Sequence, residues 1–253
     1  MMPSVELYTF AISHFSEKVR WVLDLEGILY EEKQLLPGLH FFTTRRLASK
    51  NTVPVLRHGG IIIQGSTEIV RAVPGIFGAR RLDPPASLAA ACEELETLAD
   101  QAFGRGVQKI AYAALLPERQ RMTELWSLGR GPWAKLFYAV TYPGIARAVK
   151  RMYRAEPAEV ERAKTAFRRA LLRTDELLSH HPFLLGESLT RADICVAALI
   201  APLLSPPEHD IQFSPYPAAL QDFVDELANS PTARHVRRLY RDYRSPPSPQ
   251  LGA

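Results

Sequence analysis

Strand-like and helix-like stretches alternate through the first third of the chain, and their order limits the fold more than any other feature. β-Branched and aromatic runs predict four strands, at residues 5–10, 28–35, 52–57 and 61–63. Apolar residues at helical spacing predict three helices, at residues 16–25, 43–49 and 67–72. Because a helix joins the first strand to the second, those two strands are expected to be parallel, with a right-handed connection.

Glycines and a serine mark the ends of these predicted elements. Gly27 stands where a glycine after the last turn would end the first helix. Gly59 and Gly60 suit the turn of a hairpin between the last two strands. Ser66 is expected to be the N-cap of the last short helix. The complete order, β-α-β-α-β-β-α, is the thioredoxin arrangement, which is an α/β fold.

A proline-rich stretch separates this region from a remainder that is helical in period. We expect a first domain over residues 1–79, a linker over 80–87, an all-helical second domain over 88–244 and a disordered tail over 245–253. The apolar segment 190–204 is predicted to be a central, buried helix that opens with a capping box of Thr190 and Asp193.

Composition excludes several classes of protein. With 47% hydrophobic and 23% charged residues, the 253-residue chain is expected to be globular and not disordered, collagen-like or coiled-coil. Its two cysteines, Cys92 and Cys195, are too few for a disulfide framework and are expected to be buried thiols in a reducing compartment. No secretory signal, membrane-spanning segment or nucleic-acid motif is recognisable, so we expect a cytoplasmic protein despite a net charge of +4.

Three motifs, in order along both expected domains, resemble those of the glutathione transferase family. They are Ser13-His14-Phe15-Ser16-Glu17-Lys18-Val19-Arg20, then Thr52-Val53-Pro54-Val55-Leu56 with Ser66-Thr67-Glu68-Ile69, and Gly186-Glu187-Ser188-Leu189-Thr190-Arg191-Ala192-Asp193-Ile194. The resemblance implies a thioredoxin-like, glutathione-binding domain, an all-helical domain that supplies the acceptor pocket, and a homodimer. It implies an enzyme that transfers the thiol of glutathione to an apolar electrophile. Nothing in the sequence indicates a metal.

The resemblance, to the serine-type members, implies that Ser13 is the catalytic residue. Its hydroxyl would donate a hydrogen bond to the glutathione sulfur and, with the positive end of the following helix, would favour the thiolate. Lowering a thiol pKa near 8.5 by about two units needs roughly 2.7 kcal/mol. The residues alone leave a second interpretation open, in which Ser13 or Ser16 only caps the helix. Ser16 is kept among the candidate binding residues.

The second motif supplies the other candidate binding residues. The resemblance implies a cis peptide bond between Val53 and Pro54, with the Val53 backbone N–H and C=O pairing with the cysteinyl part of glutathione. Ser66 would bind the γ-glutamyl carboxylate through its hydroxyl and the helix N-terminus, with Thr67 beside it.

Gly65 departs from the family pattern, which has Glu, Asp or Gln before the serine. An acceptor for the α-amino group of the ligand is then missing unless Gln64 or Glu68 replaces it. Gly65 therefore supports an alternative, in which the chain is a non-catalytic binding or scaffold protein of the same fold. Glutathione-dependent isomerisation and reductive ether cleavage, which serine-type members also perform, stay open as well.

Three further features have more than one interpretation. His14 either tunes the site beside Ser13 or faces solvent, and we expect it to face solvent. The aromatic residues of the second domain either line an acceptor pocket or pack in its core: Trp126, Trp133, Phe137, Tyr138 and Tyr142. A basic helix face either is solvated or meets anionic lipid: Arg147, Lys150, Arg151 and Arg154.

Overall fold

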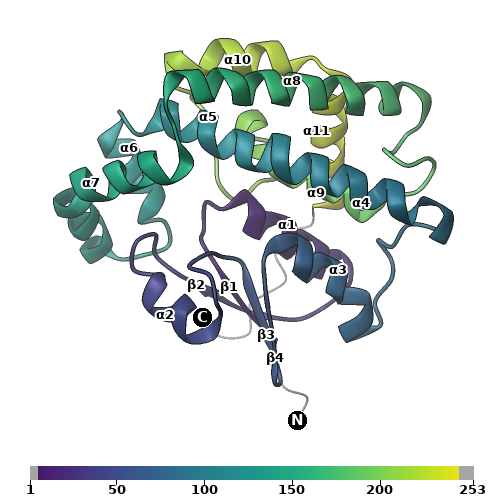
Figure 1. The fold of residues 1–253 in the computed structure, drawn as a ribbon, viewed down its shortest axis with the longest axis horizontal. Helices are drawn as coiled ribbons and strands as arrows, with labels where there is room; N and C mark the ends of the chain where they lie inside the picture. Colours follow the sequence, from purple (N-terminus) through teal and green to yellow (C-terminus); the bar gives the residue numbers. More distant parts are fainter. Residues whose placement is uncertain (1–4, 245–253) are drawn as a thin grey trace.

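The computed structural model describes residues 5–244, which begin with a four-stranded mixed sheet (Figure 1). Its strands are β1 (Val5–Thr9), β2 (Glu31–Gln34), β3 (Val55–His58) and β4 (Ile61–Gln64). Their order across the sheet is β2-β1-β3-β4, with β1 parallel to β2 and antiparallel to β3. The predicted parallel pair is confirmed, and with it the thioredoxin-like arrangement.

Two strands start later than the sequence predicts. Residues 28–30 are not part of β2, because the chain is still leaving the preceding helix: the Ile28 N–H donates to the Leu23 carbonyl oxygen, and Gly27, with φ +70°, follows the C-cap residue. Residues 52–54 are not part of β3, because Pro54 has no N–H to donate to a ladder and its bond to Val53 is cis.

Three helices accompany the sheet: α1 (His14–Leu25), α2 (Phe41–Leu47) and α3 (Ser66–Phe77). The expectation that Ser66 caps α3 is wrong by one position, because Gly65 occupies the cap and Ser66 is the first helical residue. Gly65 has φ +110°, a backbone conformation that residues with a Cβ rarely adopt. The serine side chain is thereby freed from the capping role.

The remaining chain is helical, as expected. Its elements are η1 (Ala86–Leu88), α4 (Ala89–Leu98), the π-helical η2 (Ala99–Arg105), α5 (Gly106–Leu115), α6 (Arg119–Trp126), α7 (Pro132–Tyr153), α8 (Pro157–His180), α9 (Arg191–Leu204), α10 (Ala218–Ala228) and α11 (Pro231–Tyr243). Figure 1 shows α4, η2 and α5 as one continuous helical rod. Every residue of α9 after Arg191 is buried, which confirms the predicted central helix.

One hydrophobic core joins the two regions. It contains Leu7 of β1, Trp21 of α1 and Ile69 of α3 together with the whole apolar surface of α9. In Figure 1, α1 lies between the sheet and the helical layer, and its packing against α9 forms the centre of the molecule. A second, smaller core lies under α6 and α7 and includes Leu36 from the loop after β2.

One expectation lies outside residues 5–244. The predicted disordered tail, residues 245–253, lies beyond the described part of the chain. Within the described part, none of the helices combines the length and apolar character needed to cross a bilayer.

Candidate functional site

Strand register brings three of the predicted site segments to one end of the sheet. Tyr8 of β1 pairs with Val55 of β3, and Val55 pairs with Gln64 of β4. The chain therefore leaves β1, enters β3 and leaves β4 at the same end of the sheet. The Gly65 N–H donates to the Pro54 carbonyl oxygen at 3.0 Å, which joins two of these segments directly.

Ser13 ends the turn between β1 and α1 and is the N-cap of α1. Its Oγ accepts a hydrogen bond from the Ser16 backbone N–H at 3.2 Å. The side chain is half-buried, and capping uses only a lone pair, so the hydroxyl hydrogen is available to an acceptor outside the helix. Capping and thiol activation, the two interpretations of Ser13, are therefore compatible in this geometry.

Ser16 lies one turn deeper. Its residue is fully buried, and its Oγ has no hydrogen-bond partner among residues 5–244. A buried hydroxyl without a partner is unusual in a folded protein. Ser16 contributes its backbone N–H to the Ser13 cap, and its side chain faces the protein interior instead of a solvent-accessible cleft.

The Val53–Pro54 peptide bond is cis, as the resemblance implies. Val53 is half-buried, and within the described chain neither its backbone N–H nor its C=O takes part in a hydrogen bond. Because buried backbone groups are normally paired, this residue is suited to accept an extended peptide as an additional strand.

Gln64 is committed to the protein itself. Its Oε1 accepts from the Lys50 N–H at 3.0 Å, while its Nε2 donates to the carbonyl oxygens of Lys50 at 2.6 Å and Thr52 at 2.8 Å. The amide thus holds the loop that leads into Val53. A direct contact of Gln64 with a ligand, as expected from sequence, would have to displace these bonds.

Ser66 and Thr67 occupy the first turn of α3. The Ser66 side chain is buried at 6% exposure of the residue, and no hydrogen bond of its hydroxyl is found in the described structure. Thr67 Oγ1 accepts from Lys18 Nζ at 2.8 Å and donates to Asp100. Ser66 is therefore free to bind a ligand at the α3 N-terminus, whereas Thr67 is held inside the protein.

Glu68 fills the space beside Gly65. A Cβ placed on Gly65 would lie 2.1 Å from Glu68 Oε2, so the carboxylate has folded back over the glycine. Glu68 is exposed, and its carboxylate has no ion pair or hydrogen bond within residues 5–244. An uncommitted carboxylate is thereby present where the family pattern has an acidic or amide side chain one turn earlier.

A buried lysine connects the two helices that line the site. The Lys18 side chain is fully buried, and its Nζ lies 2.7 Å from Asp100 Oδ1 in η2. Together with Thr67 the pair links α1, α3 and the helical region. Sequence reasoning missed this cluster, because the lysine and aspartate are 82 positions apart and only the fold brings them together.

His14 is buried, so the expectation that it faces solvent is wrong. Its Nε2 lies 3.0 Å from the carbonyl oxygen of Gly104 in the π-helical segment. Burial lowers the pKa of His14 to about 4, although the Gly104 carbonyl acts in the opposite direction. The imidazole is therefore neutral near pH 7 and joins the two domains next to Ser13.

The aromatic residues of α6 and α7 divide between core and surface. Trp126, Tyr138 and Tyr142 are buried, Phe137 is half-buried and Trp133 is 57% exposed. Tyr138 anchors this region to the first domain, since its hydroxyl donates to the Pro37 carbonyl oxygen at 2.7 Å. The core interpretation thus holds for three of the five.

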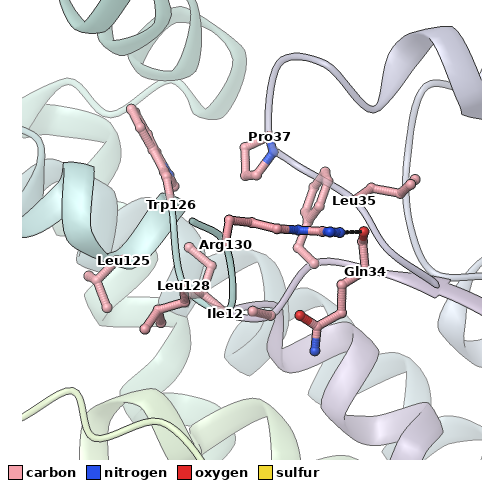
Figure 2. Close-up of a pocket in the computed structure, with 10 residues that line it drawn as sticks. Ile12, Gln34, Leu35, Pro37, Leu125, Trp126, Leu128 and Arg130 are labelled. Carbon is pink, nitrogen blue, oxygen red and sulfur yellow. Dashed lines mark hydrogen bonds between the residues drawn. The ribbon is translucent and has the colours of Figure 1, made fainter. Parts of the chain in front are cut away.

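A small cavity lies beside the turn that precedes Ser13 (Figure 2). Ile12 and Pro37 line it from the first domain, and Trp126 and Leu128 from the second. Arg130 crosses the cavity to the Gln34 carbonyl oxygen, as the dashed line in Figure 2 shows. The helical region thus contributes one wall of a cavity that adjoins the Ser13 turn.

A larger, open groove of about 740 Å³ lies next to this cavity and shares Leu125 and Leu128 with it. Arg119, Arg121 and Gln212 line the groove together with Ile211 and Pro215, among other residues. Its lining is mixed in polarity and not purely apolar.

The remaining expectations concern cysteines and charges. Cys92 and Cys195 are buried free thiols, and burial raises the pKa of Cys92 to about 11 and that of Cys195 further. The basic residues 147, 150, 151 and 154 are exposed. Among residues 5–244, no cluster of three or more His, Cys, Asp or Glu side chains could hold a metal ion.

The fold and site define the class: a thioredoxin-like domain with a cis-proline turn, followed by an all-helical domain. Family models agree, since "Glutathione S-transferase, N-terminal domain" matches residues 7–81 and "Glutathione S-transferase, C-terminal domain" matches residues 137–231. The chain belongs to the glutathione transferase family.

Solved structures with the same fold have low sequence identity to this chain. They include the β-etherase LigF from Sphingobium sp. strain SYK-6, with TM-score 0.61 and 19% identity over 93% of this chain and 99% of that one. Another is glutathione transferase GSTFuA3 from Phanerochaete chrysosporium, with TM-score 0.62 and 14% identity over 96% and 98%. The glutathione complex of CsGST63524 from Ceriporiopsis subvermispora has TM-score 0.63 and 16% identity over 97% and 99%. A comparison with curated protein sequences finds no match.

Proposed function

We propose that this chain binds glutathione at the sheet edge where Ser13, Val53 and Ser66 meet, ionises its thiol there and transfers the sulfur to an electrophilic carbon. The observation that carries the proposal is that Tyr8, Val55 and Gln64 pair in register, so that the α1 N-terminus, the unpaired Val53 backbone and the α3 N-terminus all follow or precede strands at one end of the sheet. In the transfer step the thiolate forms a carbon–sulfur bond, the leaving group departs with its electron pair, and the thiol proton has gone to solvent.

Thiol activation rests on Ser13 and α1. The half-buried hydroxyl can donate to the sulfur while its lone pair still caps the helix, and the α1 N-terminus adds a favourable potential for negative charge. A charge-assisted hydrogen bond contributes about 1.5–3 kcal/mol, which is the magnitude that a shift of two pKa units requires. His14 is neutral near pH 7 and is not the base in this proposal.

The γ-glutamyl end of glutathione carries a carboxylate and an ammonium group on one carbon. Ser66 and the α3 N-terminus suit the carboxylate, because the serine hydroxyl is unengaged by the described residues. Glu68, uncommitted and folded over Gly65, suits the ammonium group. Glu68 thus takes the role that Gln64 cannot take without releasing the Lys50–Thr52 loop. This supports an enzyme over the scaffold alternative.

Calorimetric titration with glutathione, and with its analogue lacking the α-amino group, tests this assignment. Ser66→Ala is expected to weaken binding of both ligands. Glu68→Gln is expected to weaken glutathione binding by about tenfold and to leave the analogue within about twofold, because only glutathione carries the ammonium partner. Glu94→Gln, which removes an exposed carboxylate from α4, is the matched control and leaves both affinities unchanged.

Two results separate the alternatives. Absence of binding of millimolar glutathione to the folded wild-type protein would contradict the proposed function and favour the scaffold interpretation. Glutathione binding that Glu68→Gln leaves unchanged would contradict only the role of Glu68. The proposal also includes homodimerisation and a cytoplasmic location. It covers conjugation, isomerisation and ether cleavage alike. The groove of mixed polarity suits an acceptor that is not wholly apolar.

A further inference from the structure

The guanidinium of Arg20 lies buried beneath the turn that carries Ser13. Its Nη2 donates to the Phe10 carbonyl oxygen at 2.9 Å, and its Nε donates to Glu32 Oε1 at 2.7 Å. The Arg20 and Glu32 side chains are 8% and 4% exposed. Water therefore competes little for these bonds, and the planar guanidinium fixes the direction of each one.

The Phe10 carbonyl oxygen is also the atom on which the turn closes. It accepts the Ser13 backbone N–H at 3.2 Å, so Arg20 and Ser13 are bound to the same oxygen. The orientation of this peptide group sets the position of the Ser13 backbone, from which the hydroxyl projects.

Glu32 holds the residue that precedes Phe10 in the chain. Its Oε1 accepts the Thr9 hydroxyl at 2.5 Å as well as Arg20 Nε. Thr9 is fully buried at the end of β1. We call Arg20, Glu32, Thr9 and the Phe10 carbonyl the Arg20 clamp. It forms hydrogen bonds to both Thr9 and Phe10, the two residues that lead into the turn.

A second layer of charge supports the clamp from the far end of the described chain. Arg244 follows α11, and its Nε donates to Glu17 Oε1 at 2.7 Å while its Nη1 donates to Asp24 Oδ2 at 2.7 Å. Glu17 in turn lies 3.4 Å from Arg20 Nη1. The helical domain is therefore connected, through buried charges, to the turn that carries Ser13.

We infer that Arg20 is a positioning residue for Ser13, which it serves by holding the Phe10–Ser13 turn through the Arg20 clamp. The inference rests on the proposed function, because it matters only if the Ser13 hydroxyl meets the glutathione sulfur. Arg20 acts through Ser13 and not by contact with the ligand, because its side chain is buried beneath the turn. Its effect is on the direction of the Ser13 hydrogen bond, and an error of about 1 Å in such a bond costs a large part of its catalytic value.

Arg20→Lys is the informative substitution, because it keeps the charge but offers a single ammonium group that cannot reach Glu32 and the Phe10 carbonyl with the same geometry. Two readouts are needed. The first is the pKa of the bound glutathione thiol, which is measured from the ultraviolet absorbance of the thiolate as a function of pH. The second is the calorimetric affinity for S-methylglutathione, which has no ionisable thiol and reports on the binding site alone.

The expected result is a rise of about one unit in the thiol pKa of the complex, with the S-methylglutathione affinity within about twofold of wild type. A merely structural role would weaken S-methylglutathione binding and leave the thiol pKa of the remaining complex unchanged. Arg168→Lys makes the same chemical change at an exposed pair with Glu226 and is expected to alter neither readout.

Thr9→Val provides a milder variant should Arg20→Lys fail to fold. It removes one clamp bond at constant side-chain shape, and the thiol pKa is expected to rise in the same direction by a smaller amount.

Ser13→Ala separates the two levels of the argument. In the Ser13→Ala background, Arg20→Lys is expected to produce no further rise in the thiol pKa. If Ser13→Ala itself leaves the thiol pKa unchanged, the proposed function fails and the inference fails with it. If Ser13→Ala raises the pKa but neither Arg20→Lys nor Thr9→Val does, only the positioning role of Arg20 is overturned.

Discussion

Ser13 caps α1 and, in the proposed function, also donates its hydroxyl hydrogen to the glutathione sulfur. Its lone pair accepts the Ser16 N–H at the start of α1, and its hydrogen stays available at a half-buried position. Gly65 and Glu68 also depend on each other, because the glycine has no side chain and the Glu68 carboxylate fills the space beside it.

His14 leads to a prediction about pH. Its folded-state pKa, about 4, is below the ordinary value of 6.5. Between these two pH values the imidazole is therefore protonated in the unfolded chain and neutral in the folded chain. The free energy of unfolding therefore falls as the pH drops through 6.5 toward 4 and levels off below 4. Between pH 7 and pH 5 the wild type is expected to lose about 2 kcal/mol more than His14→Gln, which can still donate to the Gly104 carbonyl.

Urea unfolding of both proteins at the two pH values measures this difference, and the comparison cancels contributions from other titrating groups. Equal losses in the two proteins would show that His14 is protonated in the folded state near pH 5.

The structural roles of site residues could be predicted from the sequence where the cause is local. The Ser13 cap follows from the preference of serine for helix N-termini, and the cap of α3 is Gly65, one position before the predicted Ser66. The burial of His14 was not predictable, because its partner Gly104 lies 90 positions away. Arg20 and Lys18 depend on partners in the same way, and only the fold shows that their charges are buried.

At the scale of elements, α9 depends on its capping box. Asp193 accepts the Thr190 N–H at 3.0 Å and the Leu184 N–H at 2.9 Å, and it lies 3.0 Å from His235 Nε2. All of these groups are buried. Asp193→Ala would leave several buried donors without a partner, and we expect it to lower the free energy of unfolding by about 3–5 kcal/mol.

Chemical denaturation of Asp193→Ala beside Thr190→Ser checks this prediction, since the serine keeps a hydroxyl at the cap and is expected to cost under about 1 kcal/mol. A loss below 1 kcal/mol for Asp193→Ala would mean that the buried donors find other partners.

Long periodic helices such as α8 and α9 could be predicted from the sequence. The order of strands and helices along the first domain could be predicted as well. The division of residues 89–115 into α4, η2 and α5 could not. The π-helical stretch carries two contacts to distant residues, since Asp100 binds Lys18 and the Gly104 carbonyl oxygen lies against His14 Nε2, and such contacts are not visible in the local sequence. The cavity wall from α6 also depends on how that helix packs on the first domain.

At the scale of the whole molecule, the domains are not independent. They share one apolar core around α1 and α9, and buried contacts such as Trp21 Nε1 to the Tyr243 carbonyl oxygen at 3.1 Å join them. We expect a single cooperative unfolding transition, in which tryptophan fluorescence and far-ultraviolet circular dichroism give the same urea midpoint. Separate midpoints would show that the two domains do not unfold as one cooperative unit.

The central claim is that Ser13 favours the thiolate of bound glutathione, and the thiol pKa of the complex tests it most directly. A spectroscopic pH titration of glutathione bound to the wild type is expected to give a thiol pKa about two units below that of free glutathione, and Ser13→Ala is expected to return at least half of that shift. A thiol pKa in the wild-type complex equal to that of free glutathione would contradict the account.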